Sequence, residues 1–210
     1  MNLYRYYWES LGIIIGPECR RIINSTETQE KTSISNDVGK VSNISVLKSS
    51  QLVSIGRYYE NITGHTDLIR EKIDTSNLFG GWRYDYSFME PFQYTEYLEG
   101  DYYNWHTDMT DVGIRMKDSD INQGLPIDIK GKVRKLTAII SLSDSNVNHG
   151  GELELQVGHN LEKSPTKIID SLSSKGNMVV FPSYLWYRIK PLKGGSKSYL
   201  TTSVWGDPFK

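Results

Sequence analysis

The sequence predicts a mainly β protein, an antiparallel sandwich or barrel with N-terminal helices packed outside it. From Trp82 onward, short aromatic or β-branched segments follow one another, separated by Gly, Asn, Asp or Pro. Two of them, residues 134–142 (RKLTAIISL) and 152–157 (ELELQV), alternate apolar and polar side chains as a half-buried strand does. About eight such strands with no helix between them indicate an antiparallel β fold rather than a βαβ fold.

Length and composition are those of one ordinary globular domain. The chain has 210 residues, 38% hydrophobic and 23% charged, and we expect a single domain over 1–210. Within it, residues 1–80 are expected to form a helical support and 81–210 the β core. The net charge of −1 and the lack of a basic block argue against a nucleic-acid surface. The single cysteine, Cys19, excludes an internal disulfide, and we expect it to be buried on a helix.

The N-terminal part contains two helix patterns around a polar stretch. Residues 15–25 (IGPECRRIINS) predict a helix with Pro17 in its first turn and Ile22 and Ile23 facing inward. Residues 25–51, rich in Ser, Thr, Asn and Lys, predict an irregular excursion with one edge strand near residues 44–48. Residues 65–77 predict the second helix, capped by Thr66 or Asp67.

The predicted β core has eight strand segments and one long connection. The segments are residues 82–90, 92–98, 101–109, 132–143, 151–157, 177–183, 185–192 and 197–205. Between the third and fourth lies a polar loop, residues 110–131, whose length is typical of a lid or mobile segment. We expect Gly150 and Gly151 to form a turn or bulge with positive φ. Arg134 and Lys135 are interpreted as charges on an edge strand rather than as cleft residues.

The tripeptide His-Thr-Asp occurs twice, at residues 65–67 and 106–108. On a strand, residues i and i+2 point to the same face, so His106 and Asp108 could meet at one metal ion. On a helix they diverge by about 200° and cannot converge, so the pair at 65–67 is interpreted as helix-capping chemistry. A two-histidine, one-carboxylate iron site needs a second histidine from a distant strand.

Four blocks together resemble one known family: QYTEYLEGDYYNWHTD, RKLTAIISLSD with GGELEL, GNMVVFPSYLW, and RIKPLKGGSKSYLTTSVWGDPF. In this order they are similar to the prolyl 4-hydroxylase-like branch of the 2-oxoglutarate/Fe(II) dioxygenases. The resemblance runs from about residue 82 to 210, with the N-terminal helices expected to belong to it as well. It implies a double-stranded β-helix, the jelly-roll or cupin-like fold.

The resemblance also implies a set of site residues. His106 and Asp108 match two of the family's iron ligands, and Tyr187 stands where the family has its distal histidine. Lys197 stands where the family has an arginine that binds the far carboxylate of 2-oxoglutarate, and it keeps the charge without the bidentate fork. Tyr97 matches a tyrosine that hydrogen-bonds the same carboxylate. The implied cofactors are Fe(II) and 2-oxoglutarate, with ascorbate as an optional third.

Tyr187 leaves three interpretations open. It could be an unusual iron ligand, although a phenol must first lose a proton with a reference pKa near 10 and then favours Fe(III). Alternatively, His106 and Asp108 alone could hold the iron. In the third interpretation the site has decayed and the fold serves binding or assembly. His149 and His159 are expected in loops off the distal strand, so neither is expected to replace the missing ligand.

The expected function is therefore a 2-oxoglutarate- and Fe(II)-dependent oxygenase that hydroxylates a prolyl or other aliphatic carbon and releases succinate and CO₂. The alternative is a non-catalytic member of the fold acting as a structural or interaction module. We expect a protein, peptide or small-molecule substrate or an assembly partner, and neither nucleic acid nor membrane. Because no segment resembles a signal peptide or a membrane span, an intracellular or virion-associated location is expected.

Overall fold

A computed structural model describes residues 5–26, 32–36, 39–47, 65–109, 130–144, 149–158 and 164–209. Most of the predicted lid, residues 110–129, lies outside these ranges, as does His159. In the described part, no helix is both long and apolar enough to cross a membrane.

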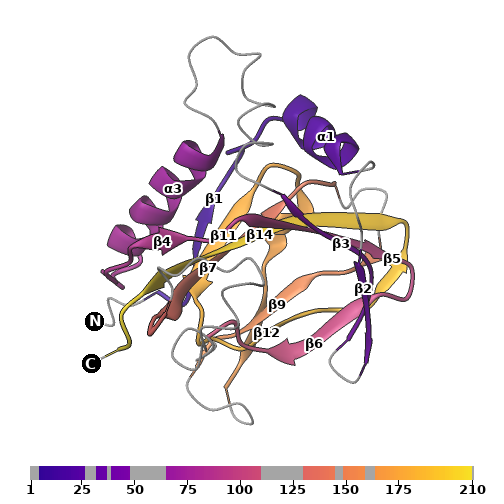
Figure 1. Cartoon of the computed structure of the whole chain (residues 1–210). Helices are drawn as coiled ribbons and strands as arrows, with labels where there is room; N and C mark the ends of the chain where they lie inside the picture. Colours follow the sequence, from indigo (N-terminus) through magenta and orange to yellow (C-terminus); the bar gives the residue numbers. More distant parts are fainter. Residues whose placement is uncertain are drawn as a thin grey trace.

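The described chain is an antiparallel β protein with two helices on one side, as the sequence predicts (Figure 1). The helices are α1 (Gly16–Ser25) and α3 (His65–Phe79), with a short 3₁₀ turn, η4 (Asp170–Ser173). The strands are β1 (Trp8–Ser10), β2 (Thr32–Asn36), β3 (Gly39–Leu47), β4 (Phe88–Met89), β5 (Phe92–Leu98), β6 (Tyr102–His106), β7 (Val133–Ser141), β8 (His149–Gly150), β9 (Leu153–Gln156), β10 (Thr166–Ile168), β11 (Met178–Pro182), β12 (Tyr187–Ile189), β13 (Leu192–Gly194) and β14 (Ser196–Gly206).

One continuous sheet carries nearly all described strands. Its order is β1-β11-β7-β14-β5-β3-β6-β12-β9-β10, with β2 paired to β3 and β4 to β14, and β13 and β8 form a separate pair. The sheet curls, so that β9, β12 and β6 face β7 and β14 across the interior (Figure 1). This is the antiparallel, jelly-roll type of architecture that the family resemblance implies.

Alternation along the strands divides the core in two. In β7, Leu136, Ala138 and Ile140 pack on the outer face of the sheet, whereas Ile139 packs in the interior of the curl. Neighbouring strands follow the same period of two, with Met178 and Val180 outside and Val179 and Phe181 inside. The strands β7, β11 and β14 therefore present a second face to the interior of the curl, and Thr137 and Lys197, described below, project from that face.

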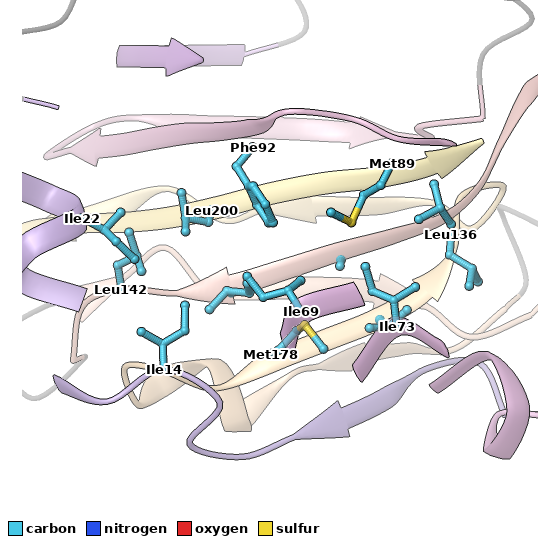
Figure 2. Packing of buried hydrophobic residues seen from close by; sticks show 14 of the residues in the cluster. Ile14, Ile22, Ile69, Ile73, Met89, Phe92, Leu136, Leu142, Met178 and Leu200 are labelled. Atoms are coloured by element: carbon cyan, nitrogen blue, oxygen red, sulfur yellow. The ribbon is translucent and has the colours of Figure 1, made fainter. Parts of the chain in front are cut away.

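The outer core is covered by the two helices. Ile22 of α1 and Ile69 and Ile73 of α3 are fully buried against the sheet, together with Leu136 and Met178 (Figure 2). In α1, Pro17 lies in the first turn and Cys19 is buried in the same cluster, both as predicted. Because the helices occupy the outer face, the inner face stays available for a site.

Three details differ from the sequence-based expectations. Residues 25–51 contain the predicted strand near residues 44–48 as part of β3, but β3 belongs to a β2–β3 hairpin and is internal rather than an edge strand, pairing with both β5 and β6. β7 is not an edge strand, since β11 and β14 flank it, so Arg134 and Lys135 are interior-sheet residues. Helix α3 includes His65, which places Thr66 and Asp67 within its first turn rather than at a cap.

The first of these differences has a physical cause. Ser, Thr and Asn interrupt the apolar alternation in β2 and β3, so the sequence pattern predicts only part of the hairpin, whereas backbone hydrogen bonds to neighbouring strands hold it in the sheet. The expected positive φ at Gly150 (85°) and Gly151 (68°) is confirmed.

Candidate functional site

The centre of the site is a strand pair, β6 with β12, in which His106 lies opposite Tyr187. The next pair in register is Tyr103 with Ile189, so three residues of β6 span the interval that two residues of β12 span. Such a bulge adds one residue to one strand and shifts its side chains to the other face. Tyr103 and His106, three residues apart, therefore meet edge to face with their ring centroids 4.1 Å apart.

The His106 imidazole is oriented by its own strand. Its Nδ1 lies 2.7 Å from the backbone carbonyl oxygen of Asn104, and a carbonyl can only accept, so Nδ1 carries the proton. Nε2 is then the free lone pair. Burial lowers the pKa of His106, only partly offset by the Asn104 hydrogen bond and the Asp108 charge, and this favours the neutral ring. A neutral imidazole whose second nitrogen is held by a carbonyl is the usual form of a metal-ligating histidine.

Asp108 lies just past the end of β6 and is held by other elements. Thr137 of β7 donates a hydrogen bond from Oγ1 to Asp108 Oδ2 at 2.8 Å, and the Arg134 guanidinium donates to the Asp108 backbone carbonyl at 3.4 Å. Asp108 Oδ1 is 3.8 Å from His106 Nε2. The two residues thus converge as predicted, although Asp108 is positioned by β7 rather than by continuation of the strand.

Tyr187 points into the same place. Its hydroxyl donates to both carboxylate oxygens of Asp108, at 3.1 and 3.0 Å, and its ring centroid is 4.1 Å from that of His106. Burial, followed by the charge of Asp108 and the hydrogen bond to it, raises the pKa of Tyr187 well above the usual phenol value. In the structure Tyr187 is therefore a neutral phenol that donates to the carboxylate.

Lys197 and Tyr97 are cross-strand partners on β14 and β5. Lys197 is only 2% exposed, and its Nζ lies 5.4 Å from the ring centroid of Tyr199. Burial lowers the pKa of Lys197, and the charge of Glu152 opposes this shift. Within the described ranges no carboxylate forms an ion pair with Lys197. A buried cation without an ion pair is costly to keep and is suited to an anionic ligand.

Lys197 and Thr137, the residue that holds Asp108, lie on the same face of the sheet. Side chains of β14 alternate, so Lys197 and Ser203, six residues apart, project to the same side. Ser203 lies opposite Thr137 on β7, and Thr137 donates to Asp108. The expected anchor of an anionic co-substrate and the His106–Asp108 pair therefore both project from the lining of the curl.

Two other predicted candidates lie elsewhere. His149 is on β8, which pairs only with β13 in the described sheets, away from the β6–β12 pair. The second His-Thr-Asp sequence opens α3, where its residues belong to a helical turn.

Thr137, Ser183 and Asn104 were not identified from the sequence. Thr137 is completely buried and contacts both Asp108 Oδ2 and, at 3.0 Å, Ser183 Oγ. Asn104 acts through its backbone carbonyl and has no sequence signal. For Thr137 a signal existed: a polar residue on the face of RKLTAIISL opposite its leucines. Arg134 was interpreted as an edge charge, and that is wrong, because it contacts Asp108 and forms an ion pair with Glu90 at 2.7 Å.

Two donor atoms of the site lie close enough together to bind the same metal ion, and a third oxygen lies beside them. Ligand atoms on one ion, each about 2.1 Å from it, lie at most about 4.2 Å apart. His106 Nε2 and Asp108 Oδ1 satisfy this at 3.8 Å, and the Tyr187 oxygen is 3.1 Å from Oδ1. Among the described residues, no group of three His, Cys, Asp or Glu side chains could hold a metal. The site thus offers an imidazole and a carboxylate, with a phenol in the third place.

A sequence model of the 2OG-Fe(II) oxygenase superfamily matches residues 92–205, more than half of the chain. The matched segment runs from β5 to β14 and so contains both strands of the central pair. The chain belongs to this superfamily, whose members use Fe(II) and 2-oxoglutarate. A comparison with curated protein sequences finds no match.

Solved structures of prolyl hydroxylases share the fold along nearly the whole chain. The viral collagen prolyl hydroxylase of Paramecium Bursaria Chlorella virus-1, in its 2OG complex, is 17% identical, with 96% of this chain and 97% of that chain covered and a TM-score of 0.59. A Pseudomonas putida prolyl-4-hydroxylase is 16% identical, with 95% and 91% covered and a TM-score of 0.61. A Trichoplax adhaerens prolyl hydroxylase, in complex with a hypoxia inducible factor peptide fragment, is 14% identical, with 95% and 83% covered and a TM-score of 0.62. At these identities the likeness concerns the fold.

Proposed function

We propose that this chain is a 2-oxoglutarate- and Fe(II)-dependent oxygenase that hydroxylates a prolyl or other aliphatic carbon. One observation supports this best: donor atoms of His106, Asp108 and Tyr187 converge. In addition, Lys197 projects from the same inner face of the sheet as Thr137, which holds Asp108. Burying Lys197, which has no ion pair within the described ranges, is costly unless a ligand uses it.

In this proposal His106 Nε2 and Asp108 would hold the iron, and the Tyr187 hydroxyl stands in the place of a third ligand. Iron and 2-oxoglutarate together would supply the oxidative chemistry, in which O₂ is consumed and succinate and CO₂ are released. The chain itself supplies orientation. Asn104 fixes the tautomer of His106, and Thr137 holds Oδ2 of the Asp108 carboxylate.

Lys197 and Tyr97 would bind the far carboxylate of 2-oxoglutarate. The ammonium supplies a point charge in a buried place, where an ion pair is worth more than at the surface. Tyr97 lies directly opposite on β5, and burial raises the pKa of Tyr97, so its hydroxyl stays a hydrogen-bond donor. Lys197 therefore contributes binding and orientation of the co-substrate rather than proton transfer.

The inner core would keep water from the reacting atoms. Its buried side chains close the curl behind the site; they are Ile139, Leu153, Leu155, Ile169, Leu172, Val179, Phe181, Leu185, Ile189, Leu192 and Tyr199. Phe181 packs against the ring of Tyr187 with the centroids 5.1 Å apart. Because these apolar side chains would exclude water, the charge interactions of Lys197 and Asp108 would be stronger and side reactions with solvent would be limited.

The test begins with metal-depleted protein under nitrogen. Adding Fe(II) and 2-oxoglutarate should produce the weak visible charge-transfer band of the bound pair, and admitting O₂ with a proline-containing peptide should produce succinate. Ascorbate is added in a parallel sample to keep the iron ferrous. Lys197→Met should lose the band, whereas Thr202→Val, a buried change on the outer face beside Ala138, should keep it.

A second function, a non-catalytic structural or interaction module that could take part in virion assembly, is favoured by one observation. The Tyr187 hydroxyl already donates to both oxygens of Asp108, so the site is satisfied without a metal. If wild type gives neither band nor succinate and Tyr187→His gives both, this alternative is correct and the oxygenase proposal is wrong. An intense blue-purple colour with Fe(III), absent in Tyr187→Phe, would instead identify Tyr187 as a phenolate ligand.

A further inference from the structure

The two oxygens of the Asp108 carboxylate have different surroundings. Oδ2 accepts two hydrogen bonds, from Thr137 Oγ1 at 2.8 Å and from the Tyr187 hydroxyl at 3.0 Å. Oδ1 accepts, among the described residues, only the Tyr187 hydroxyl at 3.1 Å and faces His106 Nε2 at 3.8 Å. Among the described residues, Oδ2 therefore has one hydrogen-bond donor more than Oδ1, and Oδ1 is the oxygen that faces the His106 nitrogen.

The hydrogen bonds behind Oδ2 have a defined direction. A threonine hydroxyl has one proton, and Thr137 gives it to Asp108 because an ionised carboxylate can only accept. Thr137 Oγ1 also lies 3.0 Å from Ser183 Oγ. In that contact Ser183 must be the donor. The protons thus point from Ser183 to Thr137 and from Thr137 to Asp108, and such a chain strengthens its final bond.

This chain of hydrogen bonds from Ser183 through Thr137 to Asp108, the Ser183–Thr137 relay, connects three separate elements of the fold. Thr137 is in the middle of β7, Ser183 directly follows β11, and Asp108 follows β6. Both hydroxyl residues are completely buried. Ser183 contributes a second contact, because its backbone carbonyl accepts a hydrogen bond from the Met109 N–H at 2.7 Å. The backbone next to Asp108 and the Asp108 carboxylate are therefore both fixed against the β7–β11 pair.

We infer that the Ser183–Thr137 relay is a positioning device for Asp108: it holds Oδ2 so that Oδ1 is the oxygen presented to a metal beside His106 Nε2. This inference rests on the proposed metal site. It assigns the carboxylate one coordinating oxygen, and it makes Thr137 and Ser183 positioning residues that contact neither metal nor substrate. Without the relay only the Tyr187 hydroxyl holds the carboxylate, and because that hydroxyl contacts both oxygens it does not select Oδ1 for the metal.

The test compares Mn(II) affinities by isothermal titration calorimetry, so that no turnover is needed. Thr137→Val keeps the shape and removes the hydroxyl, Thr137→Ser keeps the hydroxyl, and Ser183→Ala removes the outer donor. The matched control is Thr202→Val, on the neighbouring strand. Thr202 is equally buried but projects to the outer face, where its hydroxyl donates to the Glu90 backbone carbonyl at 2.9 Å.

We expect Thr137→Val to weaken Mn(II) binding by about 10-fold or more, in the range typical of residues that orient a metal ligand. Thr137→Ser should bind within a few-fold of wild type, Ser183→Ala should lie between, and Thr202→Val should be unchanged. Rescue by serine distinguishes positioning from packing, because serine restores the hydroxyl and leaves the cavity. Equal affinities of wild type and Thr137→Val would overturn the inference while leaving the metal site intact.

An experiment without metal tests the hydrogen bond between Thr137 and Asp108 independently of metal binding. Melting temperatures of Thr137→Val, Asp108→Asn and the double variant form a cycle in chelator. Strictly additive shifts would mean that the hydroxyl and the carboxylate do not interact, and this overturns the relay. If the shifts are coupled but wild type binds no Mn(II), the relay stands as a contact, whereas the proposed function and the presentation of Oδ1 to a metal both fail.

Discussion

Tyr187 donates one hydroxyl to both oxygens of Asp108, at 3.1 and 3.0 Å, across a site in which a family relative would have a histidine. A hydrogen bond to an ionised acceptor is stronger than one between neutral groups, and here both partners are largely removed from water. The same contact that keeps the metal-free site stable must be rearranged when a cation binds. Tyr187 therefore links the stability of the fold to the occupancy of the site.

The first prediction concerns that hydrogen bond in metal-free protein. Tyr187→Phe should lower the free energy of unfolding by about 2–3 kcal/mol, because it removes a charge-assisted donor from a carboxylate that is only partly exposed. Tyr199→Phe is the matched control: Tyr199 is also buried, but its hydroxyl donates to the neutral backbone carbonyl of Gly151 at 2.9 Å. That change should cost about 1 kcal/mol.

Urea unfolding in chelator measures both variants. A cost for Tyr187→Phe no larger than that for Tyr199→Phe would show that the Asp108 contact is not strengthened by charge.

The second prediction separates ligand binding from stability at Lys197. Lys197 is a buried cation with no ion pair among the residues that the structure describes, so replacing it by an apolar chain of similar length removes a desolvation cost, and Lys197→Met should be as stable as wild type or about 1 kcal/mol more stable. The same change should reduce 2-oxoglutarate affinity by at least about 10-fold, whereas Lys197→Arg should retain part of it.

Calorimetric titration with 2-oxoglutarate and thermal unfolding, on the same samples, check the two effects. Loss of stability in Lys197→Met would indicate that the lysine has a structural partner rather than a ligand.

The sequence predicts the structure well where a single periodicity decides which face of a strand a side chain occupies. The alternation in residues 134–142 identifies both faces of β7. Prediction from the sequence failed where position depends on tertiary pairing. The predicted strand over 101–109 ends at His106, and Asp108 comes near His106 because Thr137 of β7 holds it. The apolar alternation of β3 is short, so its internal place between β5 and β6 could not be predicted from composition. Thr137 gains its role only because β7 lies behind the end of β6.

The third prediction tests the contact between β3 and β6. A Cβ at Gly39 would lie 2.7 Å from the Tyr102 carbonyl oxygen and 2.9 Å from the Tyr103 ring, and that ring packs edge-on against His106. Gly39→Ala should therefore cost about 1–3 kcal/mol, as overpacked sites do, and should tilt Tyr103. In the control Gly194→Ala, on strand β13, a Cβ meets no atom within 4 Å, so stability should hardly change.

Chemical denaturation gives the cost, and the ring-proton shifts of His106 report the movement of Tyr103. Unchanged His106 shifts in a destabilised Gly39→Ala would show that β3 supports the sheet without influencing the site.

The fourth prediction is a pH dependence that originates at His106. Burial is the largest influence on this ring and lowers the pKa of His106 in the folded state, against an unfolded value of about 6.5. Above that value both states are neutral and the full stability is present. As the pH falls below about 6.5, the unfolded chain takes up a proton that the folded chain resists, so the free energy of unfolding decreases. Wild type should therefore lose more stability between pH 7.5 and 5.5 than His106→Gln, in which the other titrating groups are retained. Urea unfolding of both proteins in chelator across this range measures the difference, and parallel stability curves would mean that His106 titrates in the fold as it does in the unfolded chain.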